Sequence, residues 1–104
     1  MSRPAPDLVI EAELRDPGTP VPAPGMLHMI GVMRYVVIRV LEGDYEHAEI
    51  YVGHSGADLS DPAFQPGVRH RLELSRSFPE TASVASRFDT RDLGAFYCLS
   101  YEVI

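Results

Sequence analysis

The segment from Ile30 to Leu41 constrains the fold of this chain more than any other. It is rich in β-branched and aromatic side chains at both odd and even positions, which is typical of a β-strand. A strand that is apolar on both faces is either central in a sheet or bends around a closed barrel, so that each end buries a different side. The segment therefore predicts a long strand over residues 30–42.

Four other segments alternate between apolar and polar residues with the period of a half-buried strand. They cover residues 7–14, 47–53, 68–76 and 95–103. The side chains expected to face inward are Leu8, Ile10, Ala12 and Leu14 in the first, Ala48, Ile50 and Val52 in the second, Val68, Leu72 and Leu74 in the third, and Leu99 with its odd-numbered neighbours in the last. Five strands are therefore expected.

The connections between these strands have different characters. Proline recurs through residues 15–25, and it restricts its neighbours and removes backbone donors, so we expect a stiff, extended loop there. Residues 54–67 are rich in Gly, Asp, Ser and Pro and predict a long ordered loop with one helical turn. Residues 79–87 allow two structures: Ser77 and Glu80 have the spacing of a capping box that would begin a short helix, and a β-hairpin is the alternative.

This pattern predicts an all-β fold. A long second strand, with the largest connection between the third and fourth, suits a small five-stranded, partly open barrel of the oligonucleotide/oligosaccharide-binding (OB) type. A small β-sandwich is the alternative. We expect residues 1–104 to form a single domain, because one core suffices for a chain of this length.

Two turns resemble those of the netrin/TIMP-like subgroup of OB barrels. The long strand ends in Val40-Leu41-Glu42-Gly43, similar to a V-L-x-G turn, and Pro66-Gly67 precedes the fourth strand. The resemblance covers residues 7–76 and implies the barrel fold. Metalloprotease inhibition in that family depends on an amino-terminal cysteine whose backbone and α-amine chelate the target's zinc, whereas no cysteine precedes Cys98 here. The resemblance therefore implies the fold without the inhibitory activity.

The charge and the cysteine content limit which classes of partner and which cellular compartment we expect. The nine basic residues are all arginines, and 15 acidic residues give a formal net charge of -6, which opposes nucleic-acid binding. Cys98 is the sole cysteine, so an internal disulfide is excluded and a reducing compartment is expected. The first 30 residues lack a signal-peptide core, and no apolar run could span a bilayer. We therefore predict a cytoplasmic protein without membrane contact, unless a leader has been removed.

The candidate ligand-binding residues lie on both sides of the long loop. His54 closes the third strand and His70 opens the fourth, both at core parity, so in a barrel both can face one mouth. Asp58 and Asp61 of the loop, together with Tyr51, complete the candidate set. Two imidazoles and two carboxylates would suit a divalent transition metal. The alternative is local: loop aspartates make turns and caps, and strand-end histidines find nearby partners. We predict no resident metal or cofactor.

Apolar side chains also concentrate just after the Pro-rich loop, at Met26, Leu27, Met29, Ile30, Met33 and Tyr35. They either form an exposed contact patch or plug the open end of the barrel. His28 lies within this stretch and is expected to pack locally or to contact another subunit.

The chain shows no catalytic constellation. The strand of Cys98 offers no histidine, cation or helix amino terminus to lower the pKa of its thiol, so this residue is expected to act as a small, half-buried hydrophobe. Nucleophile elbows, phosphate-binding glycine loops and H-E-x-x-H motifs are absent from the sequence. We predict no catalytic residues and a non-catalytic binding or protein-interaction module, with a protein partner or self-association. The alternative is a small enzyme or a small-ligand or metal-binding protein that uses the barrel mouth.

Overall fold

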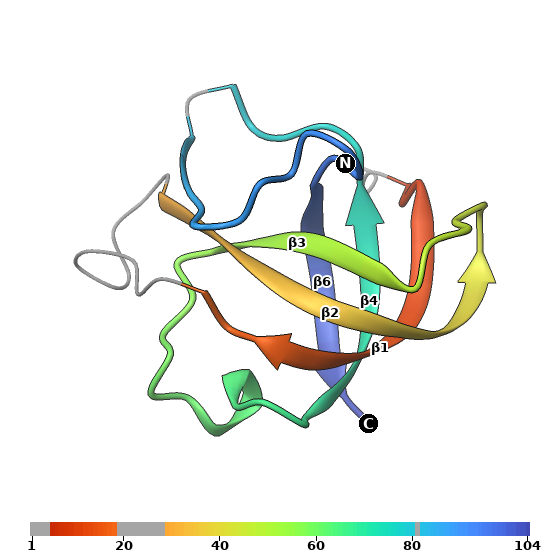
Figure 1. The fold of residues 1–104 in the computed structure, drawn as a ribbon, viewed down its shortest axis with the longest axis horizontal. Helices are drawn as coiled ribbons and strands as arrows, with labels where there is room; N and C mark the ends of the chain where they lie inside the picture. Colours follow the sequence, from red (N-terminus) through yellow and green to blue (C-terminus); the bar gives the residue numbers. More distant parts are fainter. Residues whose placement is uncertain (1–4, 19–28, 81) are drawn as a thin grey trace.

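The computed structural model describes residues 5–18, 29–80 and 82–104, which form an all-β fold (Figure 1). The strands are β1 (Leu8–Asp16), β2 (Met29–Glu42), β3 (Glu49–Ser55), β4 (Arg69–Ser75), β5 (Ser83–Ala85) and β6 (Phe96–Val103). A short 3-10 helix, η1 (Pro62–Phe64), lies between β3 and β4 and is the helical turn expected there. None of the described segments is a helix with the length and apolar character that crossing a bilayer requires.

The strands form one sheet that closes on itself. Their order is β1-β4-β6-β3-β2, with β1 also paired to β2, so five strands complete a barrel and β5 is added along β2. Closure depends on the length of β2, which pairs with β3 through residues 30–36 and with β1 through residues 34–42. The OB-like barrel is confirmed and the sandwich is not formed. The ring of five strands is closed, although a partly open barrel was expected, and its weakest seam has only two residue pairs, between β3 and β6.

The curvature of β2 comes from two β-bulges. Register shifts in the ladder with β1 leave Ile38 and Leu41 without partners on that strand. Bulges bend a strand and increase its twist, which lets β2 follow the barrel wall from one neighbour to the other. Tyr35 and Met33 point into the barrel core, whereas Ile30 is buried outside that core cluster. Both faces of β2 are therefore used, as its apolar pattern predicted.

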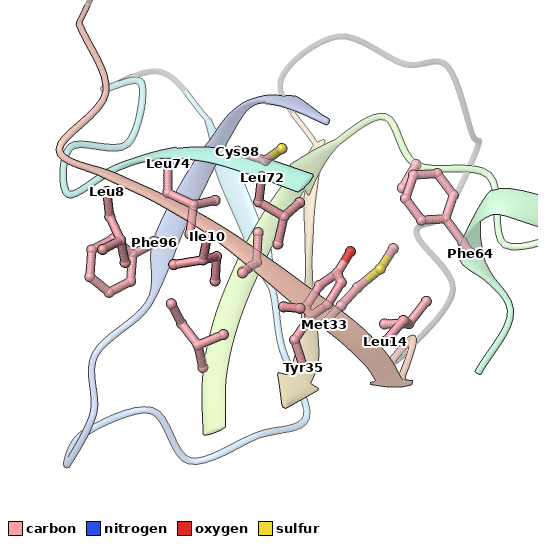
Figure 2. Packing of buried hydrophobic residues seen from close by; sticks show 14 residues of the cluster. Leu8, Ile10, Leu14, Met33, Tyr35, Phe64, Leu72, Leu74, Phe96 and Cys98 are labelled. Atoms are coloured by element: carbon pink, nitrogen blue, oxygen red, sulfur yellow. The ribbon is translucent and has the colours of Figure 1, made fainter. Parts of the chain in front are cut away.

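The barrel interior holds most of the side chains that the alternation directed inward (Figure 2). Those that are fully buried are Leu8, Ile10, Ala12, Leu14, Ile50, Val52, Leu72 and Leu74. Ala48 is exposed, because regular pairing of β3 begins only at Glu49. Before it, Tyr45 folds back so that its Oη donates to the Glu49 carbonyl oxygen at 2.5 Å. Val68, just ahead of β4, is half-buried.

The inward face predicted for β6, that of the odd-numbered residues, is wrong ahead of a bulge, where Phe96 and Cys98 are buried, and correct after it. The ladder with β4 shifts register between Cys98 and Ser100, so Leu99 is the extra residue. Before the bulge Cys98 is buried in the core; after it, Tyr101 lies opposite the buried Leu72 and so shares its side of the sheet. Leu99, expected inside, is only half-buried. A bulge breaks the period of two that the prediction assumed.

The segment between β4 and β6 forms neither the helix nor the hairpin predicted over residues 79–87, as far as it is described. Ser83–Ala85 instead pairs in parallel with Met29–Gly31 of β2. Phe78, just ahead of this segment, packs against β3, so close to Gly53 that a Cβ there would come within 2.8 Å of its ring. Burial against the wall of the barrel has replaced local helix formation.

The Pro-rich loop predicted over residues 15–25 is described only as far as Gly18. The rest of it, with Met26, Leu27 and His28, lies outside the described residues. For the part of the apolar run that is described, Ile30, Met33 and Tyr35 are buried and Met29 is half-buried. These side chains fill the structure and form no exposed patch.

Candidate functional site

Three buried residues are joined by hydrogen bonds at one end of the barrel. Tyr35 in β2 places its Oη 2.8 Å from Nε2 of His54 in β3 and 2.9 Å from Nδ1 of His70 in β4. The other ring nitrogen of His70, Nε2, lies 2.7 Å from the carbonyl oxygen of Ala63. His54 is 3% exposed, and Tyr35 and His70 are fully buried. We call His54, Tyr35 and His70 the buried polar chain.

Strand parity brings the two histidines together. His70 shares the parity of Leu72 and Leu74, and His54 that of Ile50 and Val52, so both rings point into the barrel. Their ring centroids are 6.5 Å apart. The expectation that they face one mouth is therefore met in the geometry.

The connection between β3 and β4 covers the buried polar chain. Asp61 caps η1 by accepting a hydrogen bond from the Ala63 amide at 2.9 Å, which fixes the turn that carries Phe64. The Phe64 ring lies 5.1 Å from that of His54 and 5.3 Å from that of Tyr101. It comes from η1 toward the end of the barrel where Tyr35 lies (Figure 2). Phe64 thereby covers the polar chain on the side of η1.

Burial keeps the members of the chain uncharged. Loss of solvation, with a smaller contribution from His70, lowers the pKa of His54 to about 3. Burial also lowers the pKa of His70 and raises that of Tyr35. At neutral pH both imidazoles and the phenol are therefore neutral.

A cleft opens beside this chain, where β3 and β6 separate. The two strands pair in parallel only at Val52↔Phe96 and Gly53↔Tyr97. Next to that short seam lies a cavity of about 380 Å³, which we call the β3–β6 cleft; it is lined by His54, Ser55, Tyr97, Cys98, Leu99, Ser100 and Tyr101. None of these described lining residues is an aspartate, glutamate, lysine or arginine. Burial raises the pKa of the Cys98 thiol to about 12, and the thiol donates to the Ser100 carbonyl oxygen at 3.3 Å.

The remaining predicted site residues do not join the two histidines. Asp58 is exposed and accepts from the amide and hydroxyl of Ser60 at 2.9 and 2.7 Å, and these bonds lower its pKa. Asp61 is exposed and caps η1. Tyr51 lies against Phe88, with ring centroids 5.4 Å apart, and does not line the cleft. Within the described part of the chain no three metal-ligating side chains form a cluster.

Sequence reasoning missed three residues of this region. Tyr35 could have been found, because a tyrosine at core parity in a central strand needs a polar partner for its hydroxyl. Tyr101 was predicted to face inward, and it does, but a bulge at Leu99 is what puts it there. Its contact with the histidines was not predicted. Phe64 lies in a loop without periodicity, so nothing in the sequence indicated its contact with the histidines.

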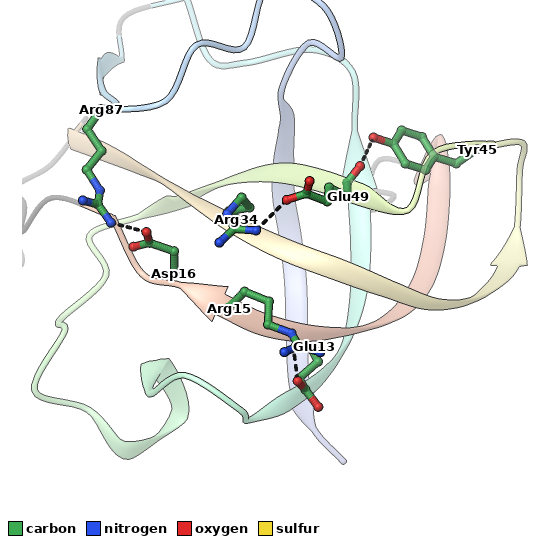
Figure 3. Close-up of polar contacts among 7 residues, drawn as sticks. All are labelled: Glu13, Arg15, Asp16, Arg34, Tyr45, Glu49 and Arg87. Atoms are coloured by element: carbon green, nitrogen blue, oxygen red, sulfur yellow. Dashed lines mark hydrogen bonds and ion pairs between the residues drawn. The ribbon is translucent and has the colours of Figure 1, made fainter.

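A second cavity, of about 280 Å³, lies at the opposite end of the barrel, beside the connection between β2 and β3. We call it the hairpin cavity. Its lining residues are Asp44, Tyr45, Glu46, His47, Arg76, Leu93 and Phe96. The Arg76 guanidinium stacks over the Phe96 ring at 5.2 Å from its centroid. The other described arginines pair with carboxylates, some of them drawn in Figure 3: Arg15 and Arg69 with Glu13, Arg34 with Glu49, Arg39 with Glu11, Arg71 with Glu73, Arg87 with Asp16 and Arg91 with Asp89. The hairpin cavity itself is lined by three exposed ionisable residues, Asp44, Glu46 and Arg76.

Comparisons with known proteins assign no family to this arrangement. A scan against protein-family models finds no match, and searches of the curated proteins and of the solved structures find none either.

Proposed function

We propose that this protein is a non-catalytic protein-interaction module that binds a neutral side chain of its partner in the β3–β6 cleft. The observation that carries the proposal is the cleft itself. Its volume of about 380 Å³ falls in the range of roughly 300–1,000 Å³ found for ligand pockets. Its lining is uncharged and includes a buried histidine, which favours a neutral group that forms one directed hydrogen bond.

The edge of β6 supports a protein as the partner. Beyond Gly53↔Tyr97 the described residues of β3 and β6 form no pairs, so the side of β6 that faces the cleft has unpaired backbone groups. Such an edge can accept an added strand from another chain. Tyr101 and Val103, 42% and 57% exposed, add apolar surface beside the cleft. An extended segment of the partner along β6 could therefore anchor one side chain in the cavity.

The state of the titratable groups supports binding over catalysis. A thiol whose pKa is near 12 is not a thiolate at neutral pH, and so Cys98 is a poor nucleophile. An imidazole whose pKa is about 3 is a weak general base, because efficient bases have pKa values near the working pH. Asp58 and Asp61 lie outside the cleft and cannot compensate.

Selection from a random peptide library displayed on phage tests this proposal. We expect enriched peptides to perturb the amide NMR signals of Ser55 and residues 97–101. They should lose at least about tenfold in affinity for Ser55→Trp, which fills the mouth of the cleft. Ser83→Trp, on exposed β5, is the matched control and should bind normally. Peptides that bind Ser55→Trp as tightly as the native protein would contradict the proposal, as would the failure to enrich any sequence.

A small-molecule-binding protein is the second candidate. The aromatic rings of Tyr97 and Tyr101 in a cavity of this size favour it. Native mass spectrometry distinguishes the two: a stoichiometric adduct of low mass, retained by the native protein and lost in Ser55→Trp, would support the small ligand. Light scattering tests the third outcome, a second copy of this chain on the β6 edge.

We also propose that the barrel is of the netrin/TIMP-like kind and that the protein is cytoplasmic. The turn glycines of the two motifs support the first, since Gly43 and Gly67 have φ values of 86° and 94° that favour glycine. The free, buried Cys98 supports a reducing compartment. A crystal structure superposed on netrin-like barrels tests the first proposal. Imaging of the full-length protein tagged at its carboxyl end tests the second.

A further inference from the structure

The hydrogen bonds of the buried polar chain have a fixed direction, which begins at Ala63. A carbonyl oxygen can only accept, so Nε2 of His70, 2.7 Å away, must carry the hydrogen. Burial favours the neutral ring, so Nδ1 of His70 keeps a lone pair. This nitrogen therefore accepts the hydroxyl hydrogen of Tyr35 across 2.9 Å.

The same logic extends to His54. The hydroxyl hydrogen of Tyr35 is already donated to His70, so its oxygen must accept from Nε2–H of His54 at 2.8 Å. A neutral imidazole has only one N–H, and so Nδ1 of His54 is left as an acceptor. The reverse direction would need a hydrogen on both nitrogens of His70, which is a cation in a fully buried position.

The free acceptor of His54 faces the cleft. In the described part of the chain no side-chain nitrogen or oxygen that is sealed from solvent lacks a hydrogen-bond partner. Nδ1 of His54 has no partner there, so it keeps contact with solvent. The cavity that His54 lines is the β3–β6 cleft. A ligand in the cleft would therefore meet the hydrogen-bond acceptor Nδ1 of His54 on a wall without charged side chains.

We infer that the β3–β6 cleft selects neutral groups that donate a hydrogen bond to Nδ1 of His54, such as an indole, a phenol or a primary amide. The inference rests on the proposed function for the location of the site and adds the chemistry of the ligand. A carboxylate has no hydrogen to donate and would leave Nδ1 facing another acceptor. A cation would find no counter-charge among the lining residues. The carbonyl oxygen of Ala63 in η1 fixes this selectivity, because it sets the direction of the hydrogen bonds through His70, Tyr35 and His54.

The first experiment measures the direction of the chain without a ligand. Two-dimensional ¹⁵N NMR of the histidine side chains at neutral pH should show the Nε2–H tautomer for both His54 and His70. In Tyr35→Phe the nitrogen signals of His54 should shift toward the values of a ring that exchanges between its two tautomers, whereas Tyr45→Phe should leave them unchanged. A His54 ring with its hydrogen on Nδ1 would overturn the inference and leave the proposed function standing.

The second experiment measures the selectivity, with indole and 1-methylindole as probes of nearly equal shape. Indole should shift the amide signals of Ser55 and residues 97–101 with an affinity at least about tenfold higher than that of 1-methylindole, because the methylated probe leaves Nδ1 unpaired. The preference should vanish in His54→Phe. Equal affinities for the native protein would overturn the inference alone. The absence of shifts at the cleft with both probes would overturn the inference and the proposed site together.

Discussion

The two ends of the barrel each hold a cavity, yet they treat polar groups in opposite ways. Beside the β3–β6 cleft, polar atoms are buried, neutral and joined in series from Ala63 to His54. At the hairpin cavity, Arg76 and its acidic neighbours are charged and exposed. A buried donor without a partner costs about 1–3 kcal/mol. An exposed ion pair contributes about 0–1 kcal/mol, because water and salt screen it.

This difference teaches where specificity can reside in a small barrel. The buried end can be built in only one hydrogen-bonded arrangement, so it can present a single acceptor in a defined state. The exposed end can exchange its partners with water at little cost. The following predictions compare the two ends, from the largest expected effect to the smallest.

The largest contrast concerns the thiol in the wall of the cleft. The pKa of Cys98 is raised from 9.0 to about 12, so at pH 8 its thiolate fraction is about a thousandfold lower than that of a free cysteine. The greater nucleophilicity of a more basic thiolate offsets part of this, so the native protein should react with dithiodipyridine at least about thirtyfold more slowly. Stopped-flow absorbance measures the rate. Unfolding in guanidinium chloride is the control and should restore the rate of a free cysteine. Equal rates in the two states would show that this end is open to water.

Removal of one tyrosine hydroxyl at each end should lower the free energy of unfolding by different amounts. Tyr35→Phe leaves buried nitrogens of His54 and His70 without a partner and should lower the free energy of unfolding by about 3 kcal/mol. Tyr45→Phe removes a more exposed bond to Glu49 and should lower it by about 0.5–1 kcal/mol. Urea unfolding followed by circular dichroism measures both. Equal losses would contradict the contrast drawn above.

Acid should destabilise the protein through its buried histidines. The folded pKa of His54 is about 3, below the ordinary 6.5. As the pH falls below 6.5 the unfolded chain therefore binds a proton that the folded one does not. At about 1.4 kcal/mol for each pH unit, stability should fall by about 2 kcal/mol between pH 6.5 and 5, and His70 adds in the same direction.

Urea titrations at several pH values measure this slope. His54→Gln is the matched variant and should remove the share of the slope that His54 contributes, even where the variant is less stable at every pH. The carboxyls whose pKa values are lowered, Asp16, Asp58 and Asp89, titrate below this range and do not contribute. A slope that is unchanged in His54→Gln would show that other groups cause the acid sensitivity.

The smallest effect is expected at the hairpin cavity. Arg76→Met removes the cation from the Phe96 ring and should cost about 0.5–1 kcal/mol, as exposed cation–π contacts do. The loss should shrink in high salt. Arg76→Lys, which keeps the charge, should lose less, and thermal unfolding at two salt concentrations measures both variants. A loss above that of Tyr35→Phe would reverse the comparison.

Much of the fold could be predicted because the strands follow a period of two over long stretches. The inward-facing residues are buried as their alternation predicts: Leu8, Ile10, Ala12 and Leu14 in β1, and Leu72 and Leu74 in β4. The predictions fail where a local rule gives way to packing. Leu99 is the extra residue of a bulge, and where a helix was expected Phe78 packs against Gly53 and Ser83–Ala85 pairs with β2.

The candidate site, too, was predicted correctly where it depends on strand alternation and wrongly where it depends on a loop. Parity alone placed His54 and His70 at one mouth, because both lie on regular strands. Sequence proximity suggested that Asp58 and Asp61 would join them, but both side chains are satisfied by amides two residues along the chain. Bonds of this kind join residues that the chain already holds close together, so they need no contact with distant strands.

By itself, the sequence determined the five long strands, the inward direction of most of their side chains and the absence of a recognisable catalytic motif, since these depend on residue types and local spacing. Only the tertiary structure decided that Tyr35 would join the two histidines, that η1 would supply the Ala63 carbonyl, and that β3 and β6 would separate to form a cleft. Those features join residues from five separate elements. Their geometry follows from the closure of the barrel, which no local pattern specifies.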